Sequence, residues 1–118
     1  MNETPKLYNR EKHRSRALQW LHEILAYYKE DEAYKFIVEL FDSSVTNLLV
    51  RKVQLHAAVC LFIVVKVRND RGEHIWSDDL VELADGAFTK DDLMEHEYYT
   101  LNLLNKMKIL HTLAFMIH

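Results

Sequence analysis

Glycine and proline are scarce in this sequence, with two glycines and one proline among 118 residues. Sandwiches and barrels of many short strands need frequent turns, and glycine and proline are among the residues that form them. Their scarcity therefore favours an all-α fold. Because 49% of the residues are hydrophobic, a chain of this length can bury one sizeable core, and we expect a single folded domain.

Cysteine and an excess of positive charge are also lacking. Cys60 is the only cysteine, which excludes an internal disulfide and predicts a reducing location, nuclear or cytoplasmic. The formal net charge is −3, so the basic face of a nucleic-acid-binding domain is not expected. The longest apolar run, from Ala57 to Val65, is too short to span a bilayer. We therefore predict no nucleic-acid partner and no membrane role.

The residues of common catalytic and metal sites do not gather along the chain. Gly72 and Gly86 are too far apart for a glycine-rich phosphate loop, and no serine or cysteine has an identifiable base partner. His56 and Cys60 are spaced as two metal ligands on one helical face can be. Their neighbours are apolar, however, so a buried His56 bonded to a backbone carbonyl is the simpler interpretation. We predict no enzyme, no cofactor and no metal site.

Apolar residues recur three and four apart over residues 14–29 and again over 34–45, which predicts two amphipathic helices with Asp31 capping the second. The next segment, about Val50–Arg68, is apolar on nearly every face, so we expect a central helix that the others surround. A buried strand is the alternative for residues 63–65. No second strand of similar quality is available to pair with it, and a helix is preferred.

Two further helices are predicted after a charged turn. Ser77 can cap a short helix, and Gly86 supplies a left-handed stop after it. Thr89 and Asp92 resemble a capping box that starts the fifth helix. The residues predicted for the buried stripe of that helix are Met94, Tyr98, Leu101 and Leu104.

Five helices around an apolar third one, in this order, resemble the first cyclin box. The strings that carry the resemblance are HRSRALQWLHEI, VELFDSSV, VQLHAAVCLFIVVKVRND and TKDDLMEHEYYTLNLL. The resemblance implies a cyclin-box five-helix bundle over residues 13–105, after a lead-in at 1–12 and before an apolar tail at 106–118. It also implies a regulatory subunit that binds a cyclin-dependent protein kinase at its C-helix and modulates its activity in cell-cycle control.

In cyclins, a lysine at the end of the third helix and a glutamate in the fifth act together on the kinase. The resemblance assigns these roles to Lys66 and Glu97, and it places Val67 where an aromatic side chain commonly packs on the kinase. Charge-assisted bonds to main-chain groups at the end of a kinase helix would fix that helix with little dependence on its side chains. We expect both charged side chains to lie close together, to reach solvent and to have few internal partners.

Many cyclins also dock substrates that carry an Arg-x-Leu motif in a shallow groove on the first and third helices. The resemblance implies that this groove would contain Ala17, Trp20, Val53 and Gln54. Arg16 places a charge where the groove is apolar in those cyclins, so an arginine-bearing ligand would meet repulsion. We further predict that Trp20 is substantially buried.

Other functions stay open at this point. A cyclin-fold adaptor in transcription would need a basic DNA-facing surface and usually paired repeats. A single-box decoy would bind the kinase without fully activating it, and a structural bundle would bind no kinase. The apolar tail at 106–118 must be covered by its own box, by a partner or by a second copy, so self-association through it is a further alternative.

Overall fold

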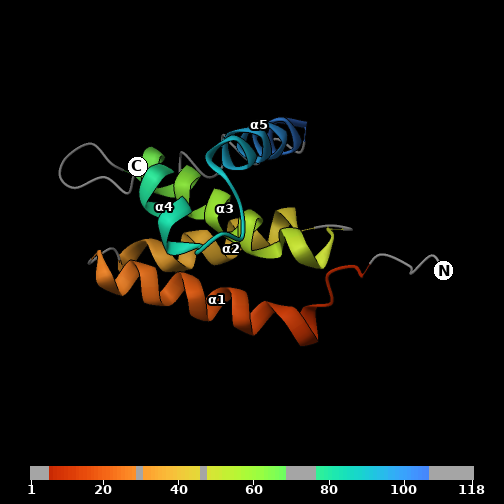
Figure 1. Ribbon diagram of the computed structural model, residues 1–118, viewed down its shortest axis with the longest axis horizontal. Helices are drawn as coiled ribbons and strands as arrows, with labels where there is room; N and C mark the ends of the chain where they lie inside the picture. The colour runs from red at the N-terminus through yellow and green to blue at the C-terminus, as the bar shows by residue number, and fades with distance from the viewer. Residues whose placement is uncertain (1–5, 29–30, 46–47, 69–76, 107–118) are drawn as a thin grey trace.

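The computed structural model describes residues 6–28, 31–45, 48–68 and 77–106. Within these residues the fold is all-α, as predicted, and the only strand-like pairing is an isolated bridge between Leu7 and Leu49 (Figure 1). The helices are α1 (Arg10–Tyr27), α2 (Tyr34–Ser44), α3 (Val53–Arg68), α4 (Ser77–Leu83) and α5 (Lys90–Lys106), with short 3-10 helices η1 (Asp31–Ala33) and η2 (Val50–Lys52).

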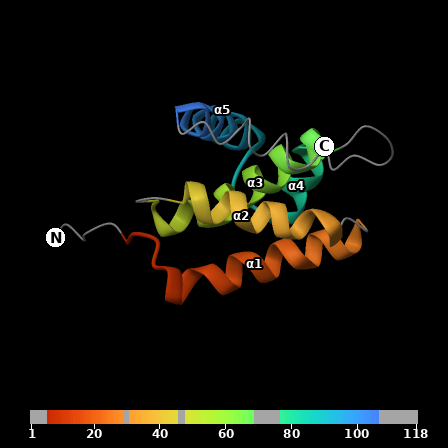
Figure 2. The same cartoon turned by 180° about the vertical axis from the view of Figure 1, so that it is seen from behind.

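Helix α3 occupies the centre of the bundle, as its composition predicts. It packs against α1 and α2 on one side and against α5 on the other (Figures 1 and 2). Its side chains from Val53 to Val65 are buried except those of Gln54 and Phe62, which are partly exposed. A helix that is apolar on nearly every face is stable in water only when neighbours cover it all round, and this arrangement provides that cover.

Helix α1 begins earlier than the apolar periodicity indicates. Its N-cap is Asn9, whose side chain accepts hydrogen bonds from the backbone N–H groups of Glu11 and Lys12, at 3.0 and 3.3 Å. The residues just before this cap pair with the connection between α2 and α3, because Tyr8 N donates to Leu48 O at 2.7 Å. The segment expected as a lead-in at 1–12 therefore contains the start of a helix and a docked strand-like stretch.

The predicted caps have different outcomes. Thr89 and Asp92 form the expected reciprocal capping box, with backbone-to-side-chain bonds of 2.9 and 3.1 Å, and Gly86 has the left-handed φ of 86°. The prediction for Asp31 is wrong. The turn η1 leads directly into α2, whose N-cap is Ala33 without a side-chain hydrogen bond.

The buried face of α5 differs from the predicted stripe. Met94 and Tyr98 are 47% and 72% exposed, Leu101 is partly buried, and of the four predicted residues only Leu104 lies in the core. The face that α5 buries consists of Leu93, His96, Glu97, Thr100 and Leu104. Polar side chains with hydrogen-bond partners replace apolar ones in this interface, which a prediction from hydrophobicity alone cannot find.

Trp20 packs against the core but is only partly buried, so the expectation of a substantially buried ring is met in part. We expect Trp20→Ala to lower the free energy of unfolding by about 1–3 kcal/mol, less than the loss for a fully buried aromatic ring. Urea denaturation measures this loss. Tyr27→Ala on the same helix is the control, because Tyr27 is 78% exposed. Equal midpoints for the two variants would contradict the packing of Trp20.

Candidate functional site

Lys66 and Glu97, which are far apart in the sequence, meet across the contact between α3 and α5. Lys66 lies in the last turn of α3, and Glu97 lies near the middle of α5. The Lys66 Nζ donates to Glu97 Oε2 in an ion pair. The prediction that the two side chains lie close together is therefore confirmed.

The expectation that both side chains have few internal partners is wrong. The Glu97 side chain is only 9% exposed and is neutralised by Lys66, whose own side chain is 50% exposed. The Lys66 ammonium also lies 4.2 Å from the centre of the Phe62 ring. A carboxylate that leaves water requires a counter-charge or hydrogen bonds, so the burial of Glu97 accounts for the internal pairing. About half of the Lys66 side chain still faces solvent.

Apolar side chains share the face of α5 on which Glu97 lies. Met94, Glu97, Tyr98 and Leu101 are spaced three and four residues apart, so they form one face of α5, which we call the α5 face. Met94 and Tyr98 are exposed, while Leu101 is partly buried, as is Val67 beside Lys66 on α3. The surface therefore presents a half-exposed cation beside apolar groups that could exclude water from a bound partner.

Two histidines form a buried polar contact next to the ion pair, since His96 directly precedes Glu97 on α5. His56 Nδ1 lies 2.9 Å from His96 Nε2, and His56 Nε2 lies 2.8 Å from Ser44 Oγ. The Cys60 sulfur is 3.6 Å from His56 Nε2. The expected backbone carbonyl partner of His56 is wrong, because side chains of α2 and α5 occupy both ring nitrogens.

Burial determines the charge state of this cluster. It lowers the pKa of His56 to about 3, with a smaller contribution from His96. It also lowers the pKa of His96 to about 4, to which the positive charge of Lys52 contributes. Burial raises the pKa of the Cys60 thiol to about 12. At neutral pH both rings and the thiol are therefore uncharged. Among the described residues, no group of three or more His, Cys, Asp or Glu side chains could hold a metal ion.

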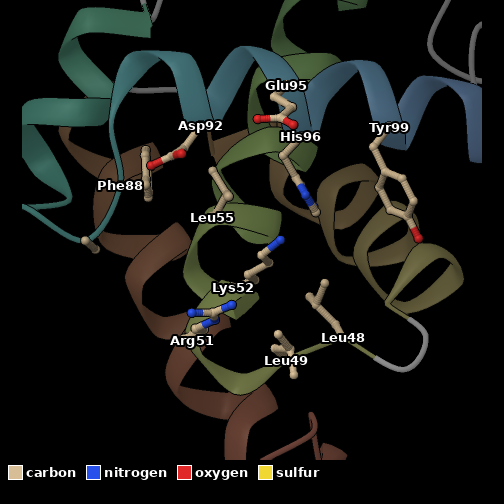
Figure 3. A pocket seen from close by; sticks show the side chains of 11 residues that line it. Leu48, Leu49, Arg51, Lys52, Leu55, Phe88, Asp92, Glu95, His96 and Tyr99 are labelled. Carbon is tan, nitrogen blue, oxygen red and sulfur yellow. The ribbon is translucent and has the colours of Figure 1, made fainter. Parts of the chain in front are cut away.

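An open cavity of about 650 Å³ lies between the start of α3 and α5. Figure 3 shows the His96 ring projecting into it from α5, opposite Lys52. Charges of both signs line the cavity, since Arg51 and Lys52 come from η2 whereas Asp92 and Glu95 come from α5. The cavity gives solvent a route to His96, although the side chain itself is largely buried.

Comparison with known proteins decides the family. The model of the family described as "Cyclin, N-terminal domain" matches residues 1–117. The chain belongs to the cyclin family. No curated protein and no solved structure matches it. The cyclin family is regulatory, not catalytic, and the all-α bundle around α3 agrees with the cyclin box fold. In the described part of this cyclin box, no helix is both long and apolar enough to cross a membrane.

Two charged residues from the strings that resemble the cyclin box join α1 to α2. Arg14 binds the Asp42 carboxylate with two hydrogen bonds, from Nε to Oδ1 and from Nη2 to Oδ2, each 2.9 Å. Arg10 Nη1 approaches the same carboxylate at 3.6 Å. Such two-point contacts fix orientation as well as distance. Nothing in the sequence alone indicated that these residues pair.

The residues assigned to a substrate-docking groove lie on α1 and α3, which pack against each other. Ala17 and Val53 are buried, whereas Trp20 and Gln54 are partly exposed. Arg16, next to Ala17 in the sequence, is exposed. The groove itself and its altered specificity stay predictions.

Proposed function

We propose that this cyclin box binds a cyclin-dependent protein kinase in the nucleus or cytoplasm and modulates its activity in cell-cycle control. The observation that carries the proposal is the ion pair of Lys66 and Glu97, which brings α3 and α5 together at a surface bordered by Val67 and the α5 face. The resemblance assigns these two charged residues to the start of the kinase C-helix. The match to the cyclin family supports a regulatory protein of this kind.

Lys66 still has hydrogen-bond donors available for a partner while it is paired with Glu97. An ammonium group carries three N–H donors, and the bond to Glu97 occupies one of them. The half-exposed Lys66 can therefore donate to carbonyl groups at the end of a kinase helix while it still neutralises Glu97. Contact with the α5 face would shield these bonds from water and strengthen them. We expect kinase binding to add contacts to the pair, not to require its separation.

Substitutions at the ion pair test the proposal directly. Lys66→Met and Glu97→Gln preserve side-chain shape, which matters because Glu97 is largely buried. Each should weaken binding to a monomeric cyclin-dependent kinase by roughly five- to a hundred-fold, as expected for the loss of one or two charge-assisted bonds. The double variant should lose most of the binding. Calorimetric titration of the purified protein into the kinase measures these affinities.

Lys12→Met is the matched control, because Lys12 is an exposed lysine on α1. It should bind the kinase as the unmodified protein does. Histone phosphorylation measured in the same titration distinguishes an activator from a decoy that binds without full activation. No binding by the unmodified protein, or equal binding by all variants, would refute the proposal.

Self-association through the tail stays outside this proposal, because residues 107–118 lie beyond the described part of the chain. A nucleic-acid partner, a membrane partner and a role as a transcription adaptor also form no part of it. No feature of the described residues favours any of them over kinase binding.

A further inference from the structure

The hydrogen bonds of the buried Ser44 hydroxyl determine which ring nitrogen carries the proton in His56 and in His96. Ser44 Oγ lies 2.6 Å from the backbone carbonyl oxygen of Leu40, a separation that requires the hydroxyl proton to lie between the two oxygens. A hydroxyl has one proton, so Ser44 must accept a hydrogen bond from His56 Nε2. His56 Nδ1 is then an acceptor, and His96 Nε2 must carry the proton between the two rings.

This hydrogen-bond chain is complete only while both rings are neutral. A proton added at His56 Nδ1 would place two N–H groups against each other at the 2.9 Å contact with His96. A proton added at the other nitrogen of His96 would leave a charge on a side chain that is 7% exposed and lies near Lys52. Either event opposes the close packing of α5 on α3.

The hydrogen bonds of Ser44, His56 and His96 also lie next to the proposed kinase-binding pair of Lys66 and Glu97. His96 and Glu97 are consecutive on α5, and their partners His56 and Lys66 lie on the same helix, α3. Contacts from two successive residues of a helix point in directions about 100° apart, so together they fix its rotation about its own axis. A rotation of α5 that separates the two rings would therefore also move Glu97 relative to Lys66.

We propose that the hydrogen bond between His56 and His96 is a positioning contact, which holds α5 in the rotation that brings Glu97 to Lys66 and which is released when either ring gains a proton. Its consequence for kinase binding rests on the proposed function, whereas the positioning itself does not. Several titratable or charged groups lie around the two rings. Cys60 on α3 contacts His56, and Asp42 on α2 acts electrostatically on Cys60. Lys52 on η2 acts on His96, Tyr99 on α5 packs against the His96 ring, and Arg51, Asp92 and Glu95 line the cavity beside it.

The neutral tautomers can be observed without any kinase. In protein labelled with ¹⁵N in the histidine rings, NMR at pH 7 should show both rings protonated at Nε2 and a scalar coupling across the bond from His96 to His56. A ring protonated at Nδ1, or the absence of that coupling, would overturn the proposal.

A double-mutant cycle tests the positioning. His56→Leu and His96→Met each leave the other ring without its partner, so each single variant should shift the NMR resonance of the Glu97 carboxyl carbon and weaken kinase binding about five- to thirty-fold. The double variant leaves no unpaired polar group, and packing of the two apolar side chains then holds α5 in place of the hydrogen bond, so both readouts should return close to those of the unmodified protein. Single variants that leave the Glu97 resonance unmoved would contradict the positioning role.

Two further comparisons separate this proposal from the proposed function. Ile24→Val, in the buried part of α1, lowers stability without touching either pair and should leave kinase affinity unchanged. Lowering the pH from 7 to 4, close to the pKa of His96, should weaken the scalar coupling between the two rings, whereas at pH 5 both rings remain neutral and the coupling should be unchanged. If the unmodified protein binds no kinase, the proposed function fails, and the Glu97 resonance alone still decides the positioning.

Discussion

Phe41→Ala should lower the free energy of unfolding by about 3–5 kcal/mol, which is a large part of the stability of a small domain. Phe41 lies on α2, and its side chain is fully buried. Its ring contacts Tyr8 edge-on, with the centroids 5.9 Å apart, and lies 5.7 Å from the His56 ring. Removing it would open a cavity that joins the N-terminal segment, α2 and α3, and these rigid elements can fill it only in part.

Urea denaturation followed by circular dichroism measures this loss. Phe36→Ala is the matched control, because Phe36 lies on the same helix and is only partly buried. We expect a smaller loss for Phe36→Ala, and Phe41→Leu should retain most of the stability because it leaves a smaller cavity. Equal losses for the two alanine variants would show that the buried position of Phe41 is wrong.

Acid should destabilise the fold through the two buried histidines. Their pKa values in the folded protein, about 3 for His56 and about 4 for His96, lie below the value near 6.5 of an unfolded chain. The unfolded chain therefore binds protons first as the pH falls. Stability is complete above pH 6.5 and declines by about 1.4 kcal/mol per pH unit for each histidine until the folded values are reached.

The variant that combines His56→Leu with His96→Met isolates this effect from that of the carboxylates. Denaturation midpoints measured between pH 7 and pH 4 should fall more steeply for the unmodified protein than for this variant. Parallel curves would mean that the rings are already charged, or are solvated, in the folded protein.

The sequence predicts the fold well where a pattern of neighbouring residues is compatible with only one structure. The third helix is apolar on nearly every face, and with so few turn-forming residues only a central helix satisfies that pattern. The capping box of Thr89 and Asp92 is equally local, since both bonds join residues three apart. The start of α1 was missed because residues 10–16 are mostly charged, and Asn9 has no apolar periodicity beside it to mark it as a cap.

The candidate site was harder to predict, because its geometry depends on partners from distant parts of the chain. The resemblance selected Lys66 and Glu97 correctly as neighbours, but no local pattern indicates that Glu97 is buried. The same holds for His96, whose partner His56 belongs to another helix. Met94 and Tyr98 are more hydrophobic than His96 and Glu97, so the prediction assigned them to the buried face. The predicted stripe was therefore placed on the exposed side of α5.

The bridge between Leu7 and Leu49 has a consequence for the order of folding. It joins the stretch before α1 to the stretch before α3, so it closes a loop of chain that contains both α1 and α2. Closing so long a loop in an unfolded chain costs conformational entropy, and that cost falls once the two helices have paired. The backbone bond from Val50 N to Lys6 O should therefore form after α1 and α2 have docked, and it would be among the first to open.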